Sequence, residues 1–263
     1  MDFAGFIRWL SPWVLFPLTV LLGVIATELG VWLSKKARLA EAGGPPPPTG
    51  SLVGAILGLL AFMLGFTFSN ASTRYSNRKE LVIQQARAIS TCYLRSGIIP
   101  EPQKNEIRAL LTDYIGILVN LKNPSDIDSN VSKLEILNLQ IWDKASSLVR
   151  ENMDPDLRAL YIQSVNEIIE NYSKRKTIAL VHRVPNVIWG ALYLLFILGM
   201  FIVGHEISES RRRRLLNTPI MAAAFALIVT VIADMDSASS SRNFKANLQP
   251  LIDAQKMMKA VGP

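Results

Sequence analysis

The sequence predicts an all-α integral membrane protein with four transmembrane helices and a helical-bundle insertion between the second and the third. Hydrophobic residues make up 50% of the 263-residue chain and charged residues only 19%, which is typical of a membrane protein with a substantial polar part. Four apolar stretches are long enough to cross a bilayer. The polar segment between the second and third repeats its apolar residues at helical spacing, and no segment shows the alternation expected of strands.

The four predicted spans cover residues 12–33, 52–71, 184–204 and 216–233. At ~1.5 Å per residue, about 20 helical residues cross the ~30 Å apolar thickness of a bilayer. Tryptophan favours the boundary between water and lipid, and four tryptophans lie near the predicted ends: Trp9, Trp13, Trp32 and Trp189. Between the first two spans, four consecutive prolines cannot be helical and predict a short exposed connector.

The polar segment predicts four helices, over residues 73–96, 102–121, 132–152 and 155–183. The stretches "GIIPEP" and "KNPSDIDSN" contain the turn residues that separate them. "SKLE", beginning at Ser132, has the spacing of a capping box, and Asp154 before Pro155 is typical of a helix start. No glycine or proline interrupts the chain between the second span and the first of these helices, so we expect one continuous helix to join them.

These boundaries divide the chain into four parts. We expect a first transmembrane hairpin (residues 1–71), a polar helical module (72–183), a second transmembrane hairpin (184–234) and a C-terminal tail (235–263) that ends in a short helix. Both ends of the polar module continue into spans, so the module is held close to the membrane.

Composition and motifs exclude several functions. The net charge of +7 is concentrated beside apolar segments, which indicates charges flanking a membrane, and no nucleic-acid-binding motif is present. Cys92 is the only cysteine, which excludes an internal disulfide and a cysteine-cluster metal site. No catalytic triad or metalloprotease motif occurs. We therefore expect no enzymatic activity, no catalytic residues, no cofactor, no metal site and no nucleic-acid partner.

The second span carries the most informative pattern. Gly50, Gly54 and Gly58 recur every fourth residue, which lets another helix approach closely. Phe62 and Phe66 follow on one helical face, and polar residues come next, at Ser69, Asn70 and Thr73. The same pattern also fits ordinary helix packing, because phenylalanine pairs commonly fill hydrophobic cores.

Three acidic residues form a second, weaker candidate site for an ion or a proton. Glu28 lies inside the first span, where a carboxylate is costly and often functional, although it is near enough to the boundary to reach the headgroups. Asp234 and Asp236 end the fourth span and could bind a cation. The alternative for these two aspartates is a polar helix end paired with nearby arginines.

From Phe66 onward the chain resembles a known family. "FTFSNASTRYSNRKELVIQQARAIS" (66–90) is similar to the bestrophin signature, in which a phenylalanine-rich span leads into a polar linker and an Arg-aromatic pair, here Arg74-Tyr75. The whole chain resembles more closely a bacterial bestrophin-like family. Its members carry motifs that correspond to "QQARAISTCYLR" (84–95) and "DMDSASSSRNFKANLQPL" (234–251).

The resemblance implies a homo-oligomeric, pentameric ion channel, with self, membrane lipid and inorganic ions as its partners. Because the charge of Arg74 and Arg78 raises the local concentration of anions, we expect anions to be favoured over cations. The pore neck falls on Phe62 and Phe66, with Gly58 where a bulky aliphatic residue would stand. The pore mouth falls on Ser69, Asn70, Arg74 and Arg78. The alternative is a non-conducting membrane scaffold or sensor whose helical module binds a partner. The acidic calcium-binding run of animal bestrophins is absent, so calcium gating is not implied.

Two arguments disagree about membrane orientation. Basic residues occupy the short connections, with Lys35, Lys36 and Arg38 after the first span and a run of four arginines, 211–214, between the third and fourth. Short basic loops favour the cytoplasmic side, which leaves the helical module extracytoplasmic. The bestrophin resemblance instead places the module in the cytoplasm. We expect a multi-pass protein of a bacterial inner membrane and favour the extracytoplasmic module.

Overall fold

The structure is a computed structural model that describes residues 5, 10–40, 50–120, 127–151, 153–180, 184–207, 211–237 and 247–262. Within these ranges the chain is helical and contains no strand, which confirms the predicted fold class. The chain divides into two compact units. We call them the membrane unit (Met1–Arg74, Arg183–Ser237 and Arg242–Phe244) and the helical module (Tyr75–His182, Ala238–Ser241 and Lys245–Pro263).

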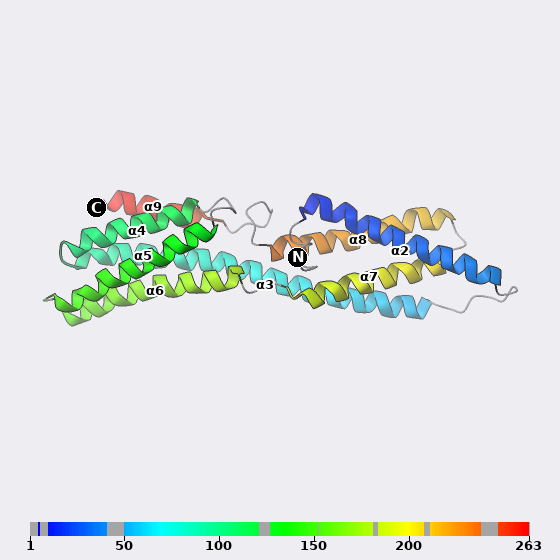
Figure 1. Cartoon of the computed structure of the whole chain (residues 1–263), viewed down its shortest axis with the longest axis horizontal. Helices are drawn as coiled ribbons and strands as arrows, with labels where there is room; N and C mark the ends of the chain where they lie inside the picture. Colours follow the sequence, from blue (N-terminus) through cyan, green and yellow to red (C-terminus); the bar gives the residue numbers. More distant parts are fainter. Residues whose placement is uncertain are drawn as a thin grey trace. The chain divides into compact units, whose positions relative to one another are not determined.

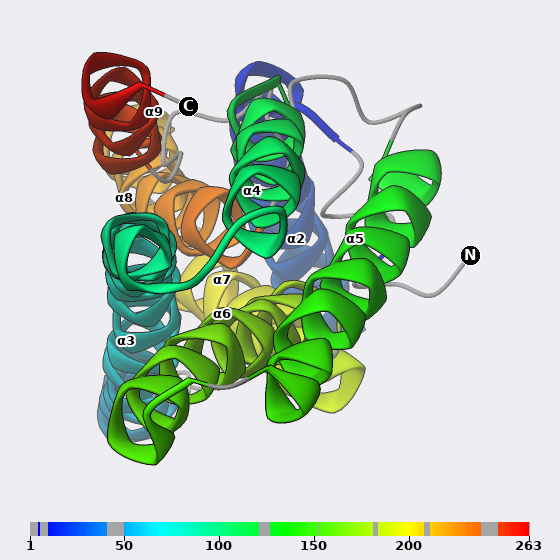
Figure 2. The ribbon, with the colours of Figure 1, turned by 90° about the vertical axis from the view of Figure 1, so that its left-hand side faces the viewer.

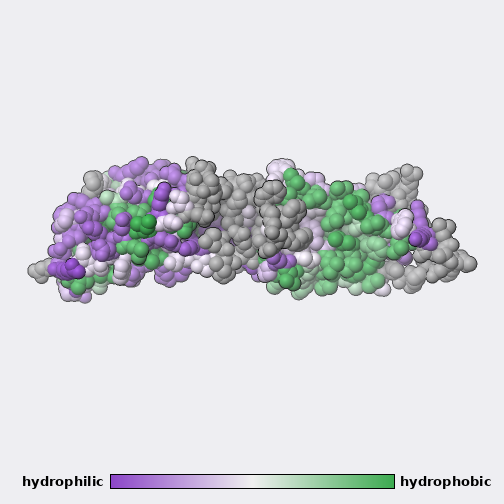
Figure 3. Space-filling model, viewed as in Figure 1, coloured by the Kyte–Doolittle hydropathy of each residue, from purple (hydrophilic) through white to green (hydrophobic). Residues whose placement is uncertain are grey.

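The membrane unit contains the four helices long and apolar enough to cross a bilayer (Figure 1). They are α2 (Pro12–Ala40), the first part of α3 (Gly50–Arg95), α7 (Asn186–Glu206) and α8 (Arg211–Asp236). α8 begins ahead of its apolar part, which starts at Asn217. On the face that Figure 3 shows, most of the described surface of this unit is hydrophobic, whereas that of the helical module is largely hydrophilic with some hydrophobic patches. The prediction of four spans is therefore confirmed.

α2 packs against α7 with almost no space between the two backbones. A Cβ atom added at Gly30 would lie 2.0 Å from the carbonyl oxygen of Phe201, and one added at Gly204 would lie 2.1 Å from that of Thr27. Only glycine leaves room for such a crossing. Aromatic packing continues the contact between α7 and α8, where the rings of Phe196 and Phe225 stack at 3.8 Å.

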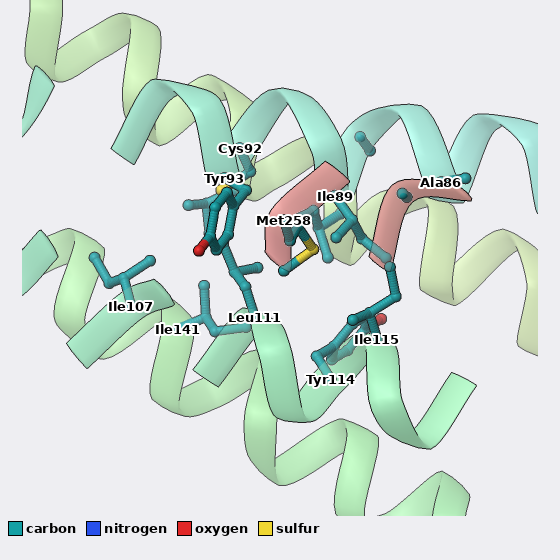
Figure 4. Packing of buried hydrophobic residues seen from close by; sticks show 14 of the residues in the cluster. Ala86, Ile89, Cys92, Tyr93, Ile107, Leu111, Tyr114, Ile115, Ile141 and Met258 are labelled. Atoms are coloured by element: carbon teal, nitrogen blue, oxygen red, sulfur yellow. The ribbon is translucent and has the colours of Figure 1, made fainter. Parts of the chain in front are cut away.

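The helical module consists of the second part of α3, then α4 (Gln103–Asn120), α5 (Ile127–Ser147), α6 (Pro155–Leu180) and α9 (Gln249–Val261). Short 3-10 turns follow α3 at Ser96–Ile98 and α5 at Leu148–Arg150. Seen end-on in Figure 2, these helices surround a common core. Figure 4 shows part of that core, in which Ile89, Leu111, Ile115 and Met258 meet.

The helix boundaries agree with the sequence at some points and differ at others. α3 is one unbroken helix of 46 residues, as the absence of glycine and proline predicted. Asp154 caps α6, since its Oδ1 accepts hydrogen bonds from the N–H groups of Asp156 (2.9 Å) and Leu157 (3.1 Å). The predicted capping box at Ser132 is wrong, because α5 already begins at Ile127. Glu135 of that motif instead pairs with Lys176 on α6.

The C-terminal helix α9, which lies within the predicted tail, packs into the module. Leu251, Ala254 and Met258 are buried in the core shared with α3 and α4. At the end of the helix, the carbonyl oxygen of Gly262 accepts hydrogen bonds from the Tyr93 hydroxyl (2.8 Å) and from Arg108 Nη1 (3.1 Å). The end of the chain therefore stabilises the module.

Candidate pore-lining site

Within the membrane unit, α3 has one packed face and one exposed face. Leu60, Leu64, Thr67 and Ala71 recur at helical spacing and are buried. At about 100° per residue, Phe62 and Phe66 lie only about 40° apart and on the opposite side of the helix. Their side chains are 69% and 54% exposed. The two predicted neck residues therefore share a face that the subunit itself does not cover.

The glycines of α3 also face away from the rest of the subunit. A Cβ atom added at Gly54 or Gly58 would meet nothing within 4 Å, and one at Gly50 would approach only the Glu206 carboxylate, at 3.4 Å. The apolar stretch of α3 is 17% buried, against 39% to 50% for the other three spans. α3 is thus the span that makes the fewest contacts within its own chain.

Polar residues continue the exposed face beyond the phenylalanines. Ser69 and Thr73 are exposed and lie within about 40° of Phe62 around the helix. Asn70 is half-buried, and its side-chain amide donates a hydrogen bond to the carbonyl oxygen of Phe66 at 3.2 Å. The structure therefore brings Ser69, and more loosely Asn70, onto the line of the predicted neck.

Arg74 lies on the other side of α3. It follows Thr67 by seven residues, which is two helical turns, and so extends the packed face. Its Nη1 donates to Asp236 Oδ1 at 3.5 Å, and the side chain is 27% exposed while that of Asp236 is 1% exposed. Arg78 is half-buried one turn further on. In the single chain Arg74 thus pairs with Asp236, and its place at the pore mouth stays a prediction.

Asp236 connects three helices of the membrane unit. Its Oδ1 also accepts a hydrogen bond from the backbone N–H of Val184, just before α7, at 3.0 Å. Asp234 is buried as well. Across the part of the chain that the structure describes, no three His, Cys, Asp or Glu side chains are grouped to hold a metal ion. This geometry favours the interpretation of Asp236 as a polar helix end paired with an arginine.

The sequence matches the model of the bestrophin-like domain over residues 21–238. The chain belongs to the bestrophin-like family. That match begins within α2 and covers the other three transmembrane helices and most of the helical module. No curated protein matches the chain significantly.

Solved structures of bacterial bestrophin homologues share the fold. The crystal structure of a mutant homologue from Klebsiella pneumoniae aligns with a TM-score of 0.70 and 12% identity, covering 92% of this chain and 97% of that one. A second structure of a homologue from this organism aligns with a TM-score of 0.66 and 14% identity, covering 93% of this chain and 94% of that one. A crystal structure described as a membrane protein aligns with a TM-score of 0.74 and 11% identity, covering 94% of this chain and 99% of that one. At these identities the likeness shows the fold alone.

Family and fold establish a bestrophin-like membrane protein, which is consistent with an ion channel and lends no support to an enzyme. The remaining predicted residues lie apart from the exposed face of α3. Glu28 is exposed on α2. Lys36 lies near the polar end of α2, with its Nζ 5.3 Å from the centre of the Trp32 ring. The side chains of Arg38 and of residues 211–214 fall outside the described part of the structure.

The sequence did not single out the glycines that pack within the subunit. Gly23, Gly30 and Gly204 make the close contacts of α2 with its neighbours, whereas the fourfold glycine pattern of α3 drew attention to Gly54 and Gly58. Gly23 and Gly30 are seven residues apart, about two helical turns, so they lie on one face of α2, and this spacing is the sequence signal for their packing. It becomes informative only when the helix that packs against that face is known.

Proposed function

We propose that this bestrophin-like chain forms a homo-oligomeric ion channel, a pentamer, whose pore is lined by the exposed face of α3. The observation that carries the proposal is the exposure of Phe62 (69%) and Phe66 (54%) on the span that is least buried within its own subunit. Lipid can cover apolar rings, but the small and polar residues on the same face suit a neighbouring helix better. Copies of the same helix around an axis would provide one.

The residues beside the phenylalanines suit close assembly. Small side chains dominate the exposed face of the α3 span: Gly50, Ser51, Gly54, Ala55, Gly58, Ala61, Gly65 and Ser69. Small residues let helices approach closely in a membrane, where packing rather than water exclusion drives association. The number of five subunits comes from the bestrophin resemblance.

Two rings of phenylalanine would act as the neck of the pore. Each ring presents apolar edges where an ion needs water, so the barrier to conduction comes from loss of water in the constriction. Gly58 contributes no side chain, so the neck would contain two hydrophobic rings and be wider at that end. Ser69 and Asn70 would follow at the polar mouth.

The charge near the mouth supports conduction of anions. Arg74 is compensated by Asp236, so its contribution to the local potential is small. In the sequence, Arg74, Arg78 and Lys79 give this stretch a formal excess of positive charge over Glu80, and Lys79 lies 5.6 Å from the ring centre of Tyr75. An excess of positive charge raises the local concentration of anions within about one Debye length, ~8 Å at physiological salt.

Flux through liposomes tests the neck directly. The protein carrying Phe62→Ala and Phe66→Ala should remain assembled and conduct more than wild type, because the constriction is wider. Phe68→Ala is the matched control, since Phe68 is 42% exposed but lies about 160° from Phe66 around the helix. It should leave flux unchanged.

The alternative, a non-conducting scaffold, predicts a different result from the same variants. If the phenylalanines pack against another helix, their truncation removes buried rings at roughly 3–5 kcal/mol each. The assembly would then dissociate or aggregate without any gain of flux. An intact oligomer whose flux is the same in wild type and both variants would also support the scaffold.

We also propose a bacterial inner-membrane location with the helical module on the extracytoplasmic side. The support is the basic residues of the short connections, and the bestrophin arrangement is the opposite one. Asn120 is exposed at the end of α4 and Cys92 is fully buried, so an Asn120→Cys variant can be labelled selectively. A membrane-impermeant maleimide should label it on intact cells from which the outer membrane has been removed. Labelling only after lysis would place the module in the cytoplasm.

A further inference from the structure

An open groove of about 650 Å³ runs between α4 and α5 on the helical module. Leu110 of α4 and Ile136 and Leu139 of α5 provide its apolar lining. Leu139 is 71% exposed and Ile136 is 55% exposed, although both lie in a module that has a buried hydrophobic core. Exposed apolar residues that line a groove and have polar neighbours are typical of an interaction site.

Carboxylates surround this apolar lining. Glu106 and Asp113 of α4 and Asp143 of α5 line the groove, and Lys144 is the one basic residue among its lining groups in the described structure. Lys144 Nζ is already paired with Glu106 Oε2 at 2.7 Å, and this hydrogen bond raises the pKa of the lysine. Within the described part of the chain, Asp113 and Asp143 form no ion pair. The groove is therefore acidic on a chain whose net charge is +7.

We propose that the groove between α4 and α5 binds a basic amphipathic helix of a partner protein. An amphipathic helix binds a groove through apolar residues at positions i, i+3, i+4 and i+7, which suits a groove that two helices form. Lysines or arginines beside that apolar stripe would meet Asp113 and Asp143. Complementary charge of this kind sets specificity and speeds association.

The chain's own basic run is not the occupant. Residues 211–214 precede the apolar part of α8 and follow α7. With four spans and the helical module inserted between the second and third, this connection lies across the membrane from the module. A neighbouring copy inserted in the same orientation has the same restriction. This excludes the run at 211–214, and the proposed occupant is a helix of another protein.

Binding to the full-length protein in phosphatidylcholine nanodiscs tests the groove. The probe is a fluorescent amphipathic peptide of leucine and lysine, and its measure is fluorescence anisotropy corrected for empty nanodiscs. The control peptide has glutamate in place of every lysine. We expect saturable binding of the lysine peptide and at least about tenfold weaker binding of the glutamate peptide, corresponding to about 1.4 kcal/mol.

Variants in the groove should separate its two contributions. Leu139→Asn removes an apolar contact, and Asp113→Asn with Asp143→Asn removes both unpaired charges. Each should weaken binding of the lysine peptide about tenfold, the second most clearly at low salt. Val149→Asn is the matched control, because Val149 is 61% exposed and lies outside the groove. All these side chains are on the surface, so the fold should be retained.

Three results would overturn the proposal. The first is equal affinity of the Leu139→Asn and Val149→Asn variants for the lysine peptide. The second is equal binding of the two peptides to wild type. The third is a Leu139→Cys variant whose thiol is inaccessible to maleimide in the assembled protein, which would show that a second copy of the chain covers the groove. None of these measurements depends on ion flux, so the proposed channel could fail while this site remains.

Discussion

Helices α2 and α3 both cross the membrane and both carry glycines, but they place them on opposite sides. In α2, Gly23 and Gly30 lie against neighbouring helices of the same subunit, with an added Cβ atom at 2.6 Å and 2.0 Å from the nearest atoms. In α3, Gly54 and Gly58 face open space. The glycines of α2 thus allow close packing within the subunit, whereas those of α3 leave room for a helix of another chain.

The exposed faces of α2 and α3 also differ in the size and polarity of their side chains. The exposed residues of α2 are bulky and apolar, including Leu18, Leu21, Ile25 and Leu29, with Trp13 and Trp32 near the two ends. Tryptophans at both ends of an apolar face are typical of a surface in contact with lipid. The exposed face of α3 is mostly small, although Leu52 and Leu59 are also exposed, and it then becomes aromatic and finally polar. Lipid is a sufficient environment for α2, whereas α3 is better suited to its own copies.

We expect the largest loss of stability from a substitution on the packed side of α2. Gly30→Ala places a Cβ atom 2.0 Å from the Phe201 carbonyl oxygen, and both backbones would have to move. We expect a loss of at least about 3 kcal/mol, the upper end of ordinary overpacking, seen as aggregation in size-exclusion chromatography. Gly54→Ala is the matched control and should behave as wild type. Equal behaviour of the two variants would contradict the close crossing of α2 and α7.

We expect the second largest loss of stability from removing the ion pair between Arg74 of α3 and Asp236 of α8. Arg74→Gln removes the charge but leaves the buried Asp236 carboxylate, which keeps its hydrogen bond from Val184. Because Arg74 is partly exposed, we expect a loss of about 1–3 kcal/mol, below that of a fully buried pair. Thermal unfolding in detergent measures it, and Arg74→Lys should restore part of the stability. A change in ion selectivity at unchanged stability would instead place Arg74 at the pore.

A substitution on the open face of α3 should affect assembly and leave the subunit intact. Gly54→Ile puts a branched side chain where the proposed neighbour approaches, which weakens close helix contact. Light scattering should show smaller species than wild type, while circular dichroism and the thermal midpoint of the dissociated subunit stay the same. Wild-type protein that is already monomeric in lipid nanodiscs would remove the basis of this comparison.

Single cysteine substitutions, which disturb the protein least, compare how accessible the two faces are to a water-soluble reagent. Ser69→Cys on α3 and Leu21→Cys on α2 each add one thiol, and the fully buried Cys92 should not react. A charged thiosulfonate reagent needs water around its target. We expect Ser69→Cys to react in liposomes and Leu21→Cys not to react. Reaction at neither position would indicate that α3 also faces lipid or packed protein.

Much of the fold follows from local signals in the sequence. Apolar length identifies the spans, and the absence of glycine and proline after Gly65 predicts the continuity of α3. Asp154 followed by Pro155 predicts the start of α6. These features depend on a few neighbouring residues, so sequence patterns are sufficient to find them.

The remaining features depend on which faces meet in space. The crossing of α2 and α7 at Gly30 and Gly204 joins segments far apart in the chain, and neither glycine is distinctive by itself. Arg74 follows Thr67 by two turns, but this places it on the packed face only when the neighbour of Thr67 is known. Likewise, "SKLE" has the spacing of a cap, but α5 already continues upstream to Ile127.

The exposure of Phe62 and Phe66 also has a genetic consequence. If these side chains meet at the axis of the proposed pentamer, one altered chain changes every ring that contains it. If wild-type and Phe62→Ala chains mix freely in equal amounts, only about 3% of five-membered rings are entirely wild type. Variants of this face should therefore be dominant when both forms are expressed together, whereas Gly30→Ala, which we expect to aggregate before it assembles, should be recessive.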